Sequence, residues 1–345
     1  MTLNPNNYIR FFGGVELVKG VTSSLIYDLH REGLYQIPTL LYDVFVEFKD
    51  KTIQEVKTTF NHEYDEGIDL YLNKFLELEL IFETDEKDAF PPNDYNDWDY
   101  PLRITNAILE IPKHDSYDLH EVLYQLDQLG CAQLQLRLIE QDNYSFSYFE
   151  NVVESLKKSR IKIIELFLPE SLFVDRKKLI LFFNVNLRLS RVLFHSAPEN
   201  KVMENENPLS KGRVVFLKEQ LNYGQSDVVT DNTMFYNIQF FAEAIGHNVA
   251  LNRKLCVNKD GLVMNYLSHS QVYGHVNDVS LETVISSDQF REKWFISNDH
   301  IEKCKDCQYR YACFFNSDIE KRNDQFFKTE NCGFDPYADK WLAGT

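Results

Sequence analysis

The sequence predicts an α/β fold whose central part is an open, partial β/α barrel. Three observations lead to this class. Short apolar runs alternate with amphipathic helical segments between residues 104 and 217, paired prolines interrupt the chain just before this alternation, and four cysteines gather near the C-terminus. We therefore expect three domains, at residues 1–95, 96–230 and 231–345, because a chain of 345 residues is long enough for two or three.

The first block begins with strand-like runs at Val15–Val18 and Leu25–Leu29, with the turn former Gly20 between them. Pro38 suits the first turn of a helix, and apolar residues then recur at helical spacing over residues 40–48 and 68–76. Strands followed by helices predict a compact α+β unit of winged-helix type. A linker runs from Pro91 to Asp97 and separates this unit from the next.

The second block alternates between strand and helix patterns, which indicates βαβ units and a parallel sheet. The expected elements are strand 104–111, helix 119–129, strand 133–139, helix 148–158, strand 162–168, helix 176–183, strand 191–195 and strand 213–217. About five strands are too few for a closed eight-stranded barrel. Residues 199–211 are polar and predict a surface excursion, and the third block, from residue 231, is aromatic and loop-rich.

The charge balance excludes some partner classes. Lys and Arg number 36 and Asp and Glu number 53, so the net charge is 36 − 53 = −17. A field of this sign repels phosphate backbones, so we expect no nucleic acid partner, whereas a basic peptide or basic protein patch is easier to attract. Residues 1–12 lack the pattern of a signal peptide, and no long uncharged apolar run occurs, so we expect a cytoplasmic protein without a membrane partner.

Four of the six cysteines form a C-x2-C-x5-C-x18-C array, made of Cys304, Cys307, Cys313 and Cys332. Two thiolates separated by two residues can point at one ion from a single tight turn, so the array suits one tetrahedral metal or iron-sulfur centre. In a reducing cytosol such cysteines are ligands more often than disulfides. Spacing alone leaves zinc and an iron-sulfur cluster both open.

The segments around this array carry a family resemblance. In chain order they read Asp260-Gly-Leu-Val, Tyr273-Gly-His-Val, Ser280-Leu-Glu, the C-x2-C-x5-C run and Cys332-Gly-Phe-Asp-Pro-Tyr. This order resembles the SPASM domain of radical S-adenosylmethionine enzymes that modify ribosomally made peptides. It is similar in particular to the SPASM-domain peptide maturase of the "grasp-with-spasm" systems. The resemblance implies an auxiliary 4Fe-4S cluster on the four cysteines, a precursor peptide and an ATP-grasp ligase as partners.

The chain departs from that family at the cofactor-binding motif. Radical S-adenosylmethionine enzymes carry C-x3-C-x2-C in the loop after the first strand of the barrel, but the corresponding loop here, residues 112–118, has no cysteine. Only Cys131 precedes residue 256, so no other segment supplies the triad, and we expect a degenerate barrel that binds no S-adenosylmethionine. Six cysteines allow one cluster with four thiolate ligands, and Cys256 is then a non-ligand.

Other catalytic motifs are missing as well, so no catalytic residue is assigned and the question of enzymatic activity stays open. The sequence has no phosphate-binding glycine loop, no nucleophile elbow and no His-Glu-x-x-His helix. Its scattered histidines are interpreted as ordinary polar residues, with His300 as a candidate hydrogen-bond donor to the cluster sulfurs.

The first block resembles the peptide-recognition domains of ribosomal-peptide modifying systems, which take a leader peptide as an extra strand at a sheet edge. By that resemblance Leu25, Tyr27, Tyr71 and Phe75 would lie near the peptide groove. Their spacing is equally that of core residues.

Three functional hypotheses follow. The chain is an accessory protein that binds a precursor peptide or its ligase, a redox enzyme that uses the cluster, or a zinc-stapled scaffold.

Overall fold

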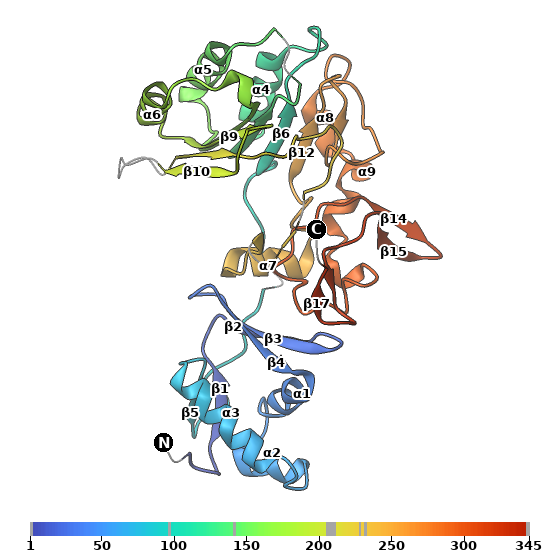
Figure 1. Ribbon diagram of the computed structural model, residues 1–345. Helices are drawn as coiled ribbons and strands as arrows, with labels where there is room; N and C mark the ends of the chain where they lie inside the picture. The colour runs from blue at the N-terminus through green and yellow to red at the C-terminus, as the bar shows by residue number, and fades with distance from the viewer. Residues whose placement is uncertain are drawn as a thin grey trace.

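The N-terminal lobe combines two small antiparallel sheets with three helices (Figure 1). The computed structural model describes residues 3–95, 98–140, 143–204, 212–227, 229–230 and 233–342. The elements of this lobe are β1 (Tyr8–Phe11), β2 (Val15–Val18), β3 (Ser23–Asp28), β4 (Gly33–Pro38), α1 (Thr39–Glu47), α2 (Ile53–Thr59), α3 (Asp65–Glu77) and β5 (Ile81–Thr84). Strand β3 lies between β2 and β4, and β1 pairs with β5. The expected strands and helices are present, and β1, β4, α2 and β5 are additions to the prediction.

The alternating side chains of β3 serve two different cores. Ile26 faces the helices, where it packs with Phe45, Leu72 and other residues of the lobe. Leu25 and Tyr27 face the opposite way and pack against residues of the C-terminal segment. Because successive side chains of a strand point to opposite faces, one short strand joins the N-terminal lobe to the rest of the chain.

The central unit is an eight-stranded sheet in the order β10-β11-β9-β8-β7-β6-β12-β13. Its strands are β6 (Asn106–Glu110), β7 (Gln133–Arg137), β8 (Ile163–Pro169), β9 (Leu189–His195), β10 (Lys201–Glu204), β11 (Arg213–Phe216), β12 (Lys254–Val257) and β13 (Val263–Met264). All neighbouring pairs from β11 to β12 run parallel, while β10 and β13 are antiparallel edge strands. The predicted parallel sheet is confirmed, and the described residues form an open sheet, not a closed barrel.

The helices of this unit cover a single face of the sheet (Figure 1). They are α4 (Leu119–Gln128), α5 (Phe146–Ser155) and α6 (Arg176–Val185), with short 3₁₀ segments at Leu156–Lys158 and Glu170–Leu172. Apolar side chains from alternate strand positions, such as Leu109, Leu136 and Leu166, pack beneath them in one large core. The other face of the sheet carries no helix from these connections and is more polar.

The C-terminal part contributes to the sheet before it becomes loop-rich. Strand β12 pairs with β6, so residues 254–257 belong to the central sheet although they follow the expected domain boundary at residue 230. The remaining elements are α7 (Ile238–Gly246), α8 (Leu281–Ser286), α9 (Asp288–Arg291), 3₁₀ turns at Glu292–Phe295 and Asn298–His300, β14 (Ile319–Arg322), β15 (Gln325–Lys328), β16 (Phe334–Asp335) and β17 (Lys340–Trp341). This region lies between the two other lobes in Figure 1.

Two sequence expectations fall partly outside the described residues. Linker residues Asn96 and Asp97 and most of the polar excursion, residues 205–211, are not described. The described part of the excursion contains β10. Within the described ranges, no helix is both long and apolar enough to cross a bilayer.

Candidate functional site

The four clustered cysteines lie on two loops of the C-terminal region. Cys304, Cys307 and Cys313 sit on the loop between the 3₁₀ turn at Asn298–His300 and β14, and Cys332 follows the β14–β15 hairpin. All four are free and half-buried. The N–H of Cys307 donates to the carbonyl of Cys304 at 3.0 Å, which closes the tight turn expected of the C-x2-C segment.

The four thiols lie within electrostatic range of one another. Burial and, to a smaller extent, the nearby Cys332 raise the pKa of Cys304 to about 11, against the opposing effect of Lys328. Burial likewise raises the pKa of Cys313 to about 12, with contributions from Cys332 and Cys304. The pKa of Cys307 is raised by burial and by the other three thiols. Because burial and the neighbouring thiols disfavour ionisation, Cys304, Cys307 and Cys313 are protonated at pH 7 in the free array.

Backbone N–H groups point at three of the four sulfurs. Tyr309 donates its N–H to Cys307 Sγ at 3.4 Å, and Phe334 does so to Cys332 Sγ at 3.4 Å. The N–H of Phe315 makes the same kind of bond to Cys313. In each case the donor stands two residues after the cysteine. Hydrogen bonds to sulfur stabilise thiolate character, so these turns favour the charged form that a metal requires.

A half-buried lysine that the sequence reasoning missed lies beside the array. Lys328, at the end of β15, donates its ammonium to the carbonyls of Phe315 at 2.8 Å and Ser317 at 3.3 Å. Burial lowers its pKa, while Cys304, Cys313 and Cys332 act to raise it. In the sequence, Lys328 simply follows the apolar pair Phe326-Phe327. This pattern is also typical of an ordinary edge strand.

Four cysteine thiols are a suitable donor set for a metal that prefers sulfur ligands, although the sulfurs do not lie in a metal-binding arrangement. Among the described residues, no group of three or more His, Cys, Asp or Glu side chains could hold a metal ion as it stands. Four thiols without a carboxylate are the donors that zinc and iron-sulfur clusters take, and Mg²⁺ and Ca²⁺ prefer oxygen. Ligation therefore requires the four sulfurs to move closer and lose their protons.

The remaining thiols lie elsewhere. Cys131 and Cys256 are fully buried, and burial raises the pKa of each to about 12. Cys131 belongs to the core under the helices, whereas Cys256 lies on β12. His300, a predicted donor to the sulfurs, has its Nδ1 3.1 Å from Ser297 Oγ.

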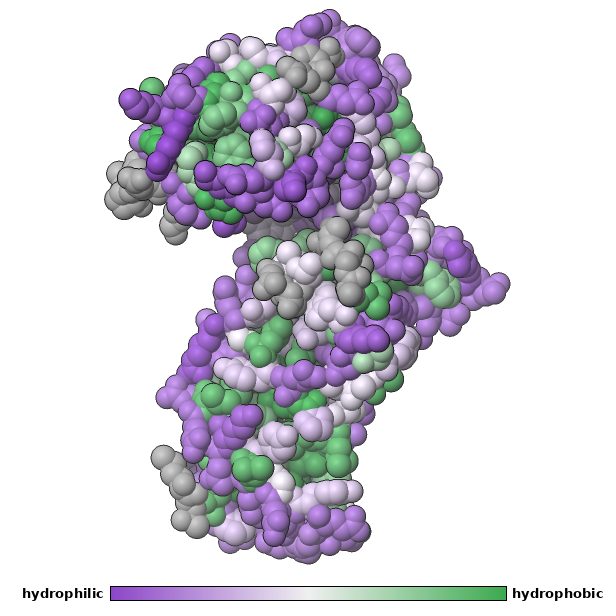
Figure 2. Space-filling view, viewed as in Figure 1, coloured by the Kyte–Doolittle hydropathy of each residue, from purple (hydrophilic) through white to green (hydrophobic). Residues whose placement is uncertain are grey.

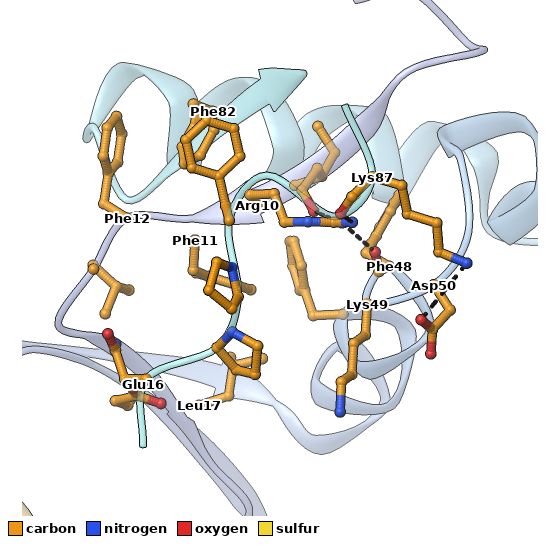
Figure 3. Close-up of a pocket in the computed structure, with 18 of the residues that line it drawn as sticks. Arg10, Phe11, Phe12, Glu16, Leu17, Phe48, Lys49, Asp50, Phe82 and Lys87 are labelled. Carbon is orange, nitrogen blue, oxygen red and sulfur yellow. Dashed lines mark hydrogen bonds and ion pairs between the residues drawn. The ribbon is translucent and has the colours of Figure 1, made fainter. Parts of the chain in front are cut away.

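A second candidate site is a groove of about 1080 Å³ in the N-terminal lobe (Figure 3). Phe11 and Phe12 at the end of β1, Phe82 on β5 and Phe48 after α1 supply aromatic walls. Strand β2 pairs only with β3 among the described strands, and its residues 15–17 also line the groove. The groove thus combines exposed aromatic rings with an edge strand, as peptide-binding sites of the strand-addition type do.

The linker that follows β5 forms one wall of this groove. Arg10 holds it by donating from Nη2 to the carbonyl of Lys87 at 2.7 Å, and Arg10 Nη1 donates to the carbonyl of Phe48 at 3.0 Å. The ring centroids of Phe82 lie 4.9 Å from Phe12 and 4.8 Å from Phe90. Phe12 and Phe90 are 43% and 47% exposed, so this aromatic row is open to a ligand.

The four predicted peptide-binding residues do not line this groove. Leu25 and Tyr27 are buried in the core shared with the C-terminal region, Phe75 is buried in the core of the N-terminal lobe, and the half-buried Tyr71 packs beside it. Strand and helix spacing marked these residues correctly as apolar positions, but not which of them would stay open. Sequence reasoning missed Phe12, Phe82 and Phe90, which approach one another only through the β1–β5 pairing.

The N-terminal lobe docks directly on the thiol-bearing loop. The hydroxyl of Tyr27 donates to the carbonyl of Gln308 at 2.8 Å, and the N–H of Val21 donates to the carbonyl of Asp306 at 2.9 Å. Arg310 Nη1 donates to the carbonyl of Lys19 at 2.6 Å. The β2–β3 turn therefore rests on the segment that carries Cys304, Cys307 and Cys313.

Comparison with known proteins finds only weak structural likenesses. No family model and no curated protein matches the chain. Among solved structures, Streptococcus suis SuiB matches at a TM-score of 0.36 and 10% identity, over 91% of this chain and 94% of SuiB. SuiB bound to precursor peptide SuiA matches at a TM-score of 0.36 and 10% identity, over 90% of this chain and 94% of SuiB. SuiB bound to S-adenosylmethionine matches at a TM-score of 0.34 and 10% identity, over 88% of this chain and 94% of SuiB. At this level of likeness, the function must be argued from the chain's own residues.

Proposed function

We propose that this chain is an accessory protein in the maturation of a ribosomally synthesised peptide and that it binds the precursor peptide through its N-terminal lobe. The observation that carries the proposal is the aromatic groove beside the edge strand β2 (Figure 3). A peptide in extended form would add main-chain hydrogen bonds at the strand edge and place alternate side chains against Phe12 and Phe82. The ATP-grasp ligase as a partner rests on the sequence resemblance.

The proposal includes one 4Fe-4S cluster held by Cys304, Cys307, Cys313 and Cys332, with a single zinc ion as the alternative. The mutual proximity of the thiols and the N–H donors at three of them support a common centre. When bound, such a centre would crosslink the two loops and, in the iron-sulfur form, could also hold an electron. The loop after β6, residues 112–118, has no cysteine, which supports a barrel that does not cleave S-adenosylmethionine.

Peptide selection on the full chain tests the groove. A displayed library of short peptides is selected on the wild type and then on Phe12→Asp, which places a charge in the aromatic row. We expect apolar sequences that bind the wild type and lose at least about tenfold in affinity for the variant, as expected for an interface anchor. Leu70→Asp is the matched control, because Leu70 lies on α3 with 68% exposure and outside the groove. Peptides that bind all three proteins equally would contradict the proposal.

Metal analysis after anaerobic purification tests the centre. Iron, sulfide and zinc contents together with the visible spectrum separate the two candidates, because zinc thiolate lacks the broad visible absorbance of an iron-sulfur cluster. We expect Cys307→Ser to lose the metal and Cys131→Ala, whose thiol lies in a different core, to keep it. Wild-type protein that takes up neither metal on reconstitution would rule out the centre while leaving the peptide groove untouched.

A further inference from the structure

The helix-free face of the central sheet carries a row of polar side chains. The strand register places Gln135 opposite Glu165 and Glu165 opposite Arg191 on neighbouring strands. Gln135 Nε2 donates to Glu165 Oε2 at 2.8 Å, and Arg191 Nη2 donates to the same oxygen at 2.9 Å. Parallel sheets that are covered on both faces are apolar on both, so this face is built for something other than a second helical layer.

A compact cationic cluster lies next to this row. Arg137 is almost fully buried and donates from Nη2 to the hydroxyl of Tyr266 at 3.2 Å. The ammonium of Lys254 lies 5.3 Å from the centroid of the Tyr266 ring. Arg137 and Lys254 are close enough to repel each other, which lowers the pKa of Lys254 in addition to the effect of burial. Arg137 and Lys254 both carry a positive charge and both contact Tyr266, so a neighbouring anion would reduce the repulsion between them.

A single carboxylate, that of Asp227, is the nearest anion, and it balances only one of the two positive charges. Asp227 Oδ1 lies 3.5 Å from Arg137 Nη2, and Tyr266 is hydrogen-bonded to the same carboxylate. Among the described residues no carboxylate lies within 4 Å of Lys254. Glu243, which also attracts Lys254, already accepts a hydrogen bond from Asn252 at 2.7 Å. The side chain of Asp227 is 42% exposed, so this partner sits at the solvent side of the cluster.

The space in front of part of this face is open, whereas Ile108 and Cys256 at β6 and β12 pack against the C-terminal region. Figure 2 shows the surface hollowed between the sheet and the region around α7, and the helix-free side of the sheet looks toward this hollow in Figure 1. Within the polar row the side chain of Arg191 is 30% exposed, and its Nε has no hydrogen-bond partner. A ligand can therefore reach the face from solvent.

We propose that the helix-free face is a carboxylate-binding site, in which a ligand carboxylate takes the position of Asp227 between Arg137, Lys254 and Tyr266. A carboxylate is the fitting group because Asp227 already presents one there, and because arginine and a phenol hydroxyl donate to it from fixed directions. The internal carboxylate then acts as a competitor that offsets one of the two positive charges while the site is empty. This inference is independent of the peptide groove and of the thiol centre.

Calorimetric titration of the full chain with glutarate tests the site, with glutaramide as the uncharged control and inorganic phosphate as the second anion. The key variant is Asp227→Asn, which removes the charge but keeps the amide oxygen that can accept from Asn316 Nδ2, a bond of 2.8 Å in the native protein. We expect this variant to bind glutarate about tenfold more tightly than the wild type, because the internal competitor is gone. Adding Lys254→Met to it should remove that gain.

Lys201→Met is the matched control, because Lys201 lies on the exposed edge strand β10 of the same sheet. It should leave glutarate binding unchanged. A merely structural role for Asp227 predicts lower stability of Asp227→Asn and no glutarate binding by any variant, which would overturn the inference. Equal affinity for phosphate would overturn the carboxylate assignment. If Asp227→Asn does not fold, Lys254→Met alone must weaken glutarate binding by the wild type, and unchanged binding there would also refute the site.

Discussion

Tyr27→Phe should destabilise the contact between the N-terminal lobe and the thiol-bearing loop. The Tyr27 side chain is fully buried, and its hydroxyl donates to the carbonyl of Gln308, a residue that is also fully buried. No other hydrogen bond to that oxygen occurs among the described residues. The substitution leaves a buried carbonyl without a donor, which costs about 1–3 kcal/mol. The aromatic ring stays, so its packing against Phe241 is retained.

The loss should be local before it is global. The N–H of Val21 donates to the carbonyl of Asp306 in the same contact, so its hydrogen exchange reports on opening between the lobes. A cost of 1–3 kcal/mol corresponds to a fivefold to roughly 150-fold faster exchange of that amide. Amides inside the parallel sheet, such as that of Leu136, should exchange as in the wild type.

Urea unfolding together with hydrogen exchange measures both effects. Tyr71→Phe is the matched control, because Tyr71 is half-buried in the core of the N-terminal lobe and its hydroxyl makes no hydrogen bond in the described part of the chain. That variant should change the free energy of unfolding by less than about 0.5 kcal/mol. If the two variants unfold alike and Val21 exchanges at the wild-type rate, the docking contact described here is wrong.

Three further predictions concern acid stability, the thiol centre and close packing. Burial lowers the pKa of His269 to about 4 from 6.5, so the unfolded chain binds the extra proton. The free energy of unfolding should therefore fall by up to about 3 kcal/mol as the pH drops from 6.5 to 4, and His269→Gln should flatten this slope in urea titrations at successive pH values. Lys328→Met removes the half-buried ammonium beside three thiols and should weaken metal retention by about tenfold in chelator competition. Retention equal to that of the wild type would refute this role of Lys328. Gly20→Ala places a Cβ against the Ser23 carbonyl and 2.8 Å from Gln308 Oε1, so it should cost about 1–3 kcal/mol, whereas Gly67→Ala, in open space on α3, should stabilise by about 0.5–1 kcal/mol in the same unfolding assay.

The sequence predicted the central sheet well because its strands and helices are long and regular. Helix 119–129 and strand 162–168, for example, differ from α4 and β8 by a residue at one or both ends. Strand β12 was missed because it is only four residues long and pairs with β6, which lies almost 150 residues earlier in the chain. Local periodicity cannot report such a pairing, so the boundary expected at residue 230 does not coincide with the end of the sheet.

The sequence pointed to a site only where the residues involved lie close together along the chain. The cysteine spacing pointed to one cluster of thiols, and the structure brings the four sulfurs into mutual electrostatic range. The groove was not predictable, since Phe12, Phe82 and Phe90 become neighbours only after β1 pairs with β5. Tyr27 was expected at a groove but is buried, because alternation along β3 fixes which residues share a face and not which face remains open.

The same loop carries the thiols and receives the N-terminal lobe, so the metal binding that we propose and the docking of the lobe would affect each other. Asp306 and Gln308 accept hydrogen bonds from the lobe and flank Cys307 in the chain. A metal that fixes this loop in one conformation lowers the entropy lost on docking, and linkage requires the same coupling in the reverse direction. If the four thiols hold a metal, its removal should therefore speed exchange of the Val21 amide in the wild type, and undocking of the lobe should weaken metal binding by the same factor. Tyr27→Phe, which only weakens docking, should reduce metal retention by at most that factor. Exchange of the Val21 amide that is unchanged by metal removal would mean that the metal binds without constraining the loop, and the thiol array would then crosslink only the C-terminal region.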